Sequence, residues 1–199
     1  MKHFFTAKRI CRAGIIAALY VALTCAFGAI GYQGFLEIRP AEALCILPLF
    51  YAEAIPALYV GCMLSNVISL YGVYDIFLGS LATLIAACLT FAAGKLLRNH
   101  AARVAVGGIF PVLVNAFLVP VIIVILYGQS NGYATAAIAY WTYFASMIVT
   151  QTLWVYALGI PLYYFVYRMR KKGVSAFLDG KKTPVQSPPE QQKRMPDRF

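Results

Sequence analysis

Three carboxylates, Glu42, Glu53 and Asp75, lie within or at the ends of long apolar segments of the sequence. A charge at membrane depth costs about 2.5–3.5 kcal/mol on insertion scales, so each side chain needs a partner or a function. Glu42 and Asp75 are expected on the same side as Glu37, where Arg39 is the one basic residue, and Glu53 is expected in a turn on the opposite side. An acidic pocket of this kind suits a cationic or hydrogen-bond-donating solute. The alternative is structural, with Glu42 paired to Arg39 and Asp75 capping a helix.

Side-chain amides at Asn66, Asn115 and Gln151 lie within other apolar segments. Amides in a helical bundle often join helices by hydrogen bonds, which is the structural alternative. Together with the ring of Trp141 they can supply donors, acceptors and an aromatic face to a planar heterocycle, although Trp is equally expected in the aromatic belt of a membrane interface. The candidate solute-binding residues are therefore Arg39, Glu42, Asn66, Asp75, Asn115, Trp141 and Gln151.

Small residues recur at a spacing of four near the N-terminus, where Ala13 and Ala17 form one stripe and Gly14 and Ala18 form a second. Such stripes allow another helix to approach closely. Packing within the bundle is one explanation, and docking on another membrane subunit is the other. All four residues are therefore candidate partner-docking residues, and the spacing does not choose between the two stripes.

Residue patterns for metal binding, catalysis and ATP hydrolysis are not found in the sequence. His3 and His100 are expected in terminal and loop positions, and the five cysteines have no CxxC spacing. There is no phosphate-binding GxxxxGK[ST] segment, and no Ser-His-Asp or Cys-His set can be assembled. We therefore predict no metal site, no cofactor and no enzymatic activity.

The composition indicates that a bilayer surrounds these residues, because 61% of the 199 residues are hydrophobic and only 12% are charged. Crossing a hydrocarbon core takes about 20 helical residues. The second apolar segment is expected to be short, kinked at Pro48 and turned around near residues 51–53. The expected spans cover residues 11–30, the first part of the interrupted segment 41–56, and then 54–70, 75–97, 104–127 and 135–167. The sequence thus predicts an all-α integral membrane protein with an N-terminal segment over 1–10, one six-helix domain over 11–170 and a basic, disordered tail over 171–199.

The net charge of +10 is unevenly distributed along the chain. Basic residues precede the first expected span, fill the gap around Arg98 and follow the last span. The positive-inside rule places these three regions in the cytoplasm, so both termini are expected there. Because topology explains the charge, we expect no nucleic-acid partner.

Three blocks of the sequence are distinctive when they occur together in this order: RPAEALCILPLF from Arg39, GCMLSN from Gly61 and DIFLGSLATL from Asp75. They resemble the QueT family of substrate-binding membrane subunits of energy-coupling factor (ECF) transporters, and the similarity extends from about Ala13 to Tyr167. The resemblance implies a six-helix S-component fold in the bacterial plasma membrane. It also implies import of a queuosine precursor such as aminomethyl-deazaguanine, with a transmembrane coupling subunit and two cytoplasmic ATPases as partners.

The ligand implied by the resemblance offers a planar face, an edge of N–H donors and an aminomethyl cation. Glu42 and Asp75 are the candidate partners of the last two groups, with no assignment of which meets which. Related S-components dock on the coupling subunit through a small-xxx-small pattern on the first helix, which both stripes of this chain match. The alternative function is an autonomous secondary transporter or channel for a small cationic or heterocyclic solute.

Overall fold

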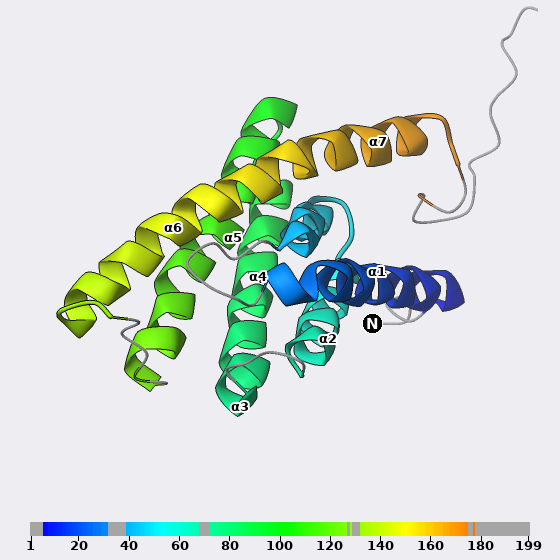
Figure 1. The fold of residues 1–199 in the computed structure, drawn as a ribbon. Helices are drawn as coiled ribbons and strands as arrows, with labels where there is room; N and C mark the ends of the chain where they lie inside the picture. The colour runs from blue at the N-terminus through cyan, green and yellow to red at the C-terminus, as the bar shows by residue number, and fades with distance from the viewer. Residues whose placement is uncertain are drawn as a thin grey trace, which may run out of the picture.

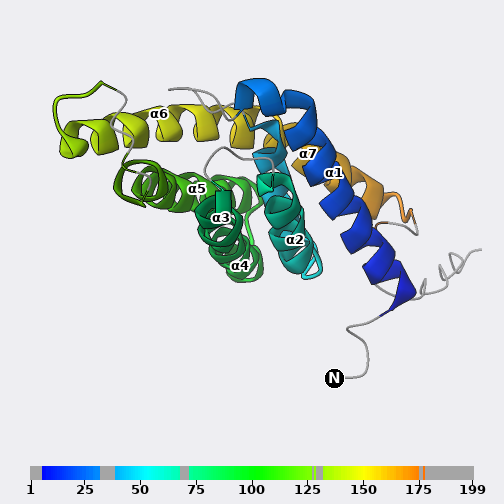
Figure 2. The same cartoon turned by 60° about the horizontal axis from the view of Figure 1, so that its bottom comes forward.

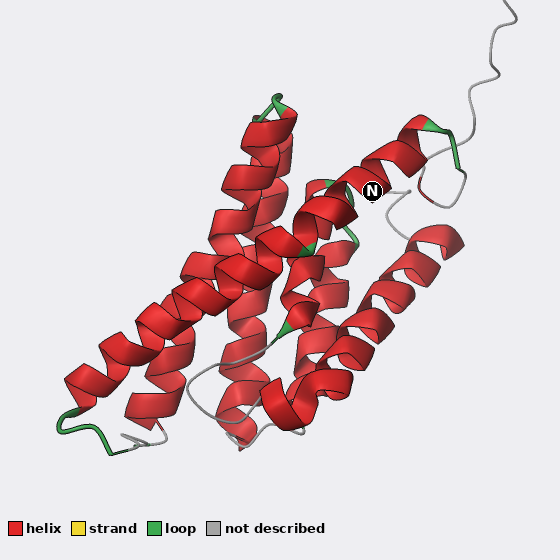
Figure 3. Cartoon of the chain, turned by 45° about the horizontal axis from the view of Figure 1, so that its top comes forward, coloured by secondary structure: helices red, strands yellow, loops and turns green. Residues whose placement is uncertain are grey.

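The computed structural model describes residues 6–31 (with side chains to Phe27), 39–67, 72–126, 128, 132–174 and 177. All regular elements in these residues are helices, and no strand occurs among them (Figures 1 and 3). The elements are α1 (Ala7–Gly31), η1 (Pro40–Leu49), α2 (Ala54–Asn66), α3 (Gly72–Tyr74), η2 (Asp75–Gly79), α4 (Ser80–Leu96), α5 (His100–Pro120), η3 (Val121–Leu126), α6 (Ala136–Ala157) and α7 (Gly159–Lys171).

Four helical stretches are long and apolar enough to cross a membrane, and they cover Ala7–Phe27, Gly72–Leu96, His100–Leu126 and Ala136–Lys171. The two shorter apolar helices, η1 and α2, follow the first stretch. The predicted all-helical membrane class is therefore confirmed, and the six apolar segments are present as four long and two short helices. Six crossings and cytoplasmic termini remain predictions, and Glu37 and the tail beyond residue 177 lie outside the described residues.

Three of the long stretches contain local irregularities, and a proline accounts for two of them. Pro120 has no N–H to donate, and the π-helical η3 begins directly after it. The last stretch is interrupted at Leu158, because Pro161 cannot complete the helical hydrogen bonds near that position. Asp75 begins the π-helical η2, within a helix that continues from Gly72 to Leu96. Short π-helical segments often occur at functional sites.

The short 3₁₀ helix η1 occupies the centre of the molecule. All ten of its residues are buried, and it packs against α1, α2, α4, α5, α6 and α7. Two glycines allow this close packing, because a Cβ on Gly94 would lie 2.9 Å from Leu49 Cα and one on Gly107 would lie 2.8 Å from Leu49 Cδ2. In Figure 2, α6 and α7 extend along one side of the bundle, with α1 next to α2. Side chains of η1 therefore contact most of the bundle.

The turn from Phe50 to Glu53 connects η1 to α2, as predicted for this region. Arg12 of α1 forms an ion pair of 2.6 Å with Glu53, and its guanidinium lies 4.0 Å from the centre of the Tyr51 ring. Arg170 of α7 donates to the Phe50 carbonyl at 3.1 Å. Basic residues from two ends of the chain thus meet at this turn, which agrees with the prediction that Glu53 and the basic segments lie on the same side of the bundle.

Candidate functional site

Glu42 of η1 is the more isolated of the two predicted acidic residues, and its side chain is 1% exposed. The Tyr20 hydroxyl of α1 donates to Oε1 at 3.0 Å, and the Cys45 thiol donates to Oε2 at 3.3 Å. Both donors are neutral, and Glu42 has no ion pair within the described residues. A buried carboxylate is costly unless it is paired, so this position is suited to a ligand that carries positive charge or several N–H donors.

Asp75 is also 1% exposed, and it differs from Glu42 in having a nearby cation. Arg39 Nη2 lies 3.7 Å from Asp75 Oδ2, and the Asn66 amide donates to the Asp75 carbonyl oxygen at 2.9 Å. Gly79 provides the space for this arrangement, because a Cβ there would lie 2.6 Å from Asp75 Oδ1 and 3.0 Å from Asn66 Nδ2. The three sequence blocks therefore meet in one place, at the start of η1, the end of α2 and the start of η2.

The structure can be compared with the structural alternative for the two carboxylates, in which Glu42 pairs with Arg39 and Asp75 caps a helix. Arg39 forms its ion pair with Asp75, while its link to Glu42 is a backbone bond from the Glu42 N–H to the Arg39 carbonyl at 3.1 Å. Asp75 is not at the N-cap position of the described helix, because that helix already begins at Gly72. The i, i+3 ion pair expected from local spacing is therefore wrong, and a contact between distant segments replaces it.

The two remaining predicted amides lie on α5 and α6, which pack against each other. Asn115 is 5% exposed and Gln151 is 3% exposed. The Gln151 Oε1 atom is buried without a hydrogen-bond partner in the described part of the chain. An unsatisfied buried acceptor costs about 1–3 kcal/mol, so this oxygen is available to an N–H group of a ligand.

Trp141 lies apart from the buried polar residues, since 60% of its side chain is exposed. Its ring is perpendicular to that of Tyr140, with the ring centres 5.4 Å apart, and the Tyr140 hydroxyl donates to the Phe117 carbonyl at 3.3 Å. This position on the outer surface agrees with the interface-belt alternative for Trp141.

Tyr20 and Cys45 contact Glu42 and are further candidate site residues, which the sequence did not predict. Tyr20 lies on the same buried face of α1 as Ile16 and Thr24, and it is 2% exposed. A tyrosine in the middle of an apolar span usually needs a partner for its hydroxyl, and this signal was available in the sequence. Its partner, Glu42, was not predictable, because the two residues belong to different helices.

The structure distinguishes the two small-residue stripes of α1. Ala13 and Ala17 pack against the buried core, and a Cβ on Gly61 of α2 would lie 3.1 Å from the Ala17 carbonyl oxygen. Gly14 and Ala18 are exposed, and a Cβ on Gly14 would contact nothing within 4 Å. The first stripe is therefore an internal packing surface, and the second faces outward.

A family model described as QueT transporter matches residues 10–168, the greater part of the chain. The match includes all the buried polar residues described above. No curated protein and no solved structure matches the chain.

Proposed function

The chain belongs to the QueT transporter family, and from this membership we propose that it is the substrate-binding S-component of an ECF transporter that imports a queuosine precursor, aminomethyl-deazaguanine or a related base. Its helices make it a multi-pass membrane protein. The observation that supports a cationic, N–H-rich solute is that the Glu42 carboxylate is buried and accepts hydrogen bonds from two neutral donors.

Glu42 is the first candidate for the charged or guanidine-like part of the ligand. A carboxylate accepts two parallel N–H bonds from such an edge, and these charge-assisted bonds are roughly twice as strong as neutral ones. Asp75 is the second candidate, because Arg39 already balances part of its charge at 3.7 Å. This difference favours Glu42 for the aminomethyl cation and Asp75 for neutral N–H donors.

Amide groups complete the proposed recognition of the base. The unpartnered Gln151 oxygen can accept an N–H bond, and the Asn115 amide can both donate and accept. Asn66 contributes indirectly by holding the backbone of Asp75. A planar deazaguanine has N–H and carbonyl groups along its edges, so this set of donors and acceptors is chemically matched to it.

The outward stripe of Gly14 and Ala18 is the proposed docking surface for a transmembrane coupling subunit. Small side chains allow close contact between helix backbones in a membrane. The sequence contains no phosphate-binding GxxxxGK[ST] loop, so we assign ATP hydrolysis to two partner ATPases. Ala13 and Ala17, which pack inward, are not part of the proposed surface.

Ligand screening of the purified protein tests the proposed substrate. A ligand at 100 times its Kd stabilises the folded state by about 2.7 kcal/mol, so a true substrate raises the melting temperature measurably. We expect this increase with aminomethyl-deazaguanine and not with thiamin, riboflavin or biotin. An increase with one of the three vitamins and none with the deazaguanines would overturn the substrate assignment.

Transport assays separate the S-component from the alternative of an autonomous transporter or channel. We expect liposomes that contain this chain alone to accumulate no solute, and liposomes that also contain the coupling subunit and ATPases to accumulate it when supplied with ATP. Uptake by the chain alone would favour the alternative.

A further inference from the structure

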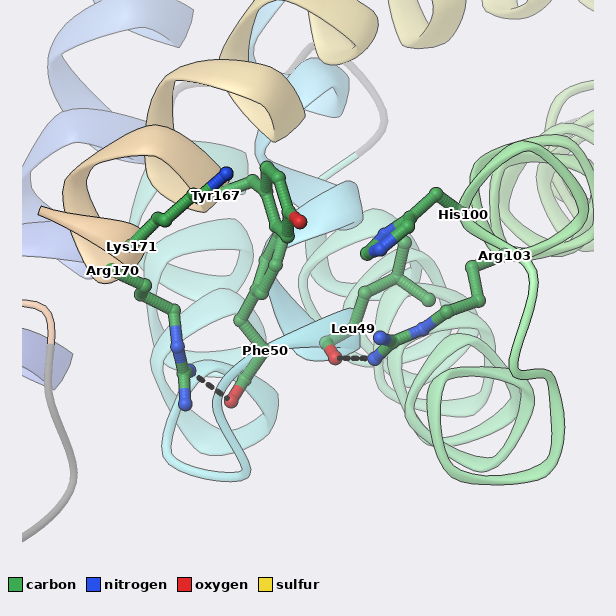
Figure 4. Close-up of a pocket in the computed structure, with 7 residues that line it drawn as sticks. All are labelled: Leu49, Phe50, His100, Arg103, Tyr167, Arg170 and Lys171. Carbon is green, nitrogen blue, oxygen red and sulfur yellow. Dashed lines mark hydrogen bonds between the residues drawn. The ribbon is translucent and has the colours of Figure 1, made fainter.

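A cavity of about 450 Å³ lies between the end of η1, the start of α5 and the end of α7 (Figure 4). It is separate from the buried carboxylates of the candidate site. Its nitrogen-bearing side chains are those of His100, Arg103, Arg170 and Lys171. No Asp or Glu among the described residues lines it, and Glu53, the carboxylate of the adjoining turn, is paired with Arg12 at 2.6 Å. The cavity therefore has an excess of positive charge.

Two arginines of this cavity are held in place by the backbone. Arg103 donates to the Leu49 carbonyl at 2.8 Å, and Arg170 donates to the Phe50 carbonyl at 3.1 Å, as the dashed lines of Figure 4 show. Both carbonyls lie at the C-terminal end of η1, where helix carbonyls need donors. The two guanidiniums approach the cavity from different helices, and their positions are set before any ligand binds.

Arg103 keeps unused N–H donors after it bonds to the Leu49 carbonyl. A guanidinium has five N–H donors, and Arg103 uses one of them on Leu49. Its Nε atom is buried and has no hydrogen-bond partner in the described part of the chain. Lys171 is exposed at the rim and adds a third positive charge. Fixed N–H donors with surplus positive charge are the chemistry that binds an oxyanion.

An aromatic wall gives the cavity a defined shape on the side of α7. The His100 Nδ1 atom lies 2.9 Å from the Tyr163 hydroxyl, and the Tyr167 ring meets the His100 ring at 4.6 Å between centres. The Tyr163 ring in turn contacts the Phe50 ring in a tilted arrangement, with 4.7 Å between the ring centres. The start of α5 is thereby anchored to α7, next to the arginines.

The location of the cavity indicates which kind of oxyanion it can meet. It lies where two membrane-spanning stretches end, at His100 and Lys171, and such helix ends reach the lipid headgroups. Basic pockets between membrane helices bind the headgroups of anionic lipids. We propose that this cavity binds a phosphate group, presented by an anionic phospholipid headgroup or as free phosphate. This site is independent of the proposed transported solute.

Lipid binding to the purified full-length protein in neutral detergent tests the proposal. Native mass spectrometry and melting temperature are measured with dioctanoyl phosphatidylglycerol, dioctanoyl phosphatidylcholine and inorganic phosphate. We expect phosphatidylglycerol to bind and to stabilise the protein, and phosphatidylcholine to do neither. Equal stabilisation by inorganic phosphate would support the site and identify free phosphate as its ligand.

Paired variants connect binding to the cavity. Lys171→Gln should weaken phosphatidylglycerol binding about fivefold, because it removes one of the positive charges that line the cavity around the proposed phosphate. Lys172→Gln removes the same charge at a neighbouring residue that does not line the cavity, and it should leave binding within twofold. Arg170→Gln, with Arg168→Gln as its matched control, repeats the comparison at the arginine held on Phe50.

Lys171→Gln is not expected to unfold the protein, since the Lys171 side chain makes no hydrogen bond to η1 among the described contacts. Equal loss in Lys171→Gln and Lys172→Gln would show general attraction to a basic surface and overturn the proposal. Equal binding of phosphatidylglycerol and phosphatidylcholine would overturn it as well.

Discussion

Glu42→Gln removes the charge of a carboxylate that is 1% exposed and keeps the size of the side chain. A glutamine carbonyl can still accept the Tyr20 hydroxyl, now 3.0 Å from Oε1, so we expect the free energy of unfolding to change by no more than about 1 kcal/mol. Ligand binding should change more, because a charge-assisted hydrogen bond contributes about 1.5–3 kcal/mol. Losing one such bond weakens binding roughly tenfold to a hundredfold.

Isothermal titration of the folded variant with aminomethyl-deazaguanine and with its uncharged nitrile analogue measures this loss. If Glu42 binds the aminomethyl cation, affinity falls for the amine alone. If it binds the guanine-like edge, affinity falls for both compounds. The difference between the two losses therefore identifies the group that the carboxylate meets.

Glu53→Gln is the matched control for this experiment. Glu53 is a buried carboxylate in the same chain, but it pairs with Arg12 at 2.6 Å in the turn between η1 and α2. Neutralising it leaves a cation without its partner, so we expect a lower melting temperature and an unchanged ligand Kd. Unchanged Kd values for both compounds in Glu42→Gln would refute the role assigned to Glu42.

Three further experiments test the docking surface, the acidic site and the topology. Ala18→Leu should abolish uptake by the complete transporter and leave solute binding intact, and uptake that survives this change would exclude the outward stripe from docking. Ala17→Leu, on the inward stripe, should instead lower the melting temperature. Gly79→Ala should lower the free energy of unfolding by about 1–3 kcal/mol and weaken binding, since the new methyl group displaces the acidic site; calorimetry measures both, and unchanged values contradict the packing. In a cysteine-free background, an external thiol reagent should label a cysteine at Asn131 and not one at Asn99, and the reverse pattern would invert the topology.

Much of the helical organisation was predictable because the length of an apolar segment is a local property. The hydropathy of the sequence predicted the long helices, and Pro48 with the polar positions after it predicted the turn that the structure places at residues 50–53. Pro40 lies in the first turn of η1, a position that suits proline because its missing N–H would have no helical partner there. The 3₁₀ form of η1 and the π-helical segments were not predicted.

Burial of the polar candidates was also predictable, and their partners were not. Polar residues inside apolar segments must be enclosed by protein, and Glu42, Asp75 and Gln151 are each at most 3% exposed. Sequence proximity favoured Arg39 as the partner of Glu42, but the fold brings Arg39 to Asp75. No sequence spacing encodes that choice, since it depends on how the start of η1 lies against η2.

The sequence by itself determined the membrane class, the family, the apolar helices and the set of polar residues that must be buried. Tertiary structure decided which of them meet and which surfaces face outward. The stripes of α1 show the reason, because Ala17 and Ala18 are equivalent in composition and spacing but lie roughly 100° apart around a helix. Packing against α2 buries the side of α1 that carries Ala17 and leaves Ala18 exposed, and only the relative placement of two helices can make that distinction.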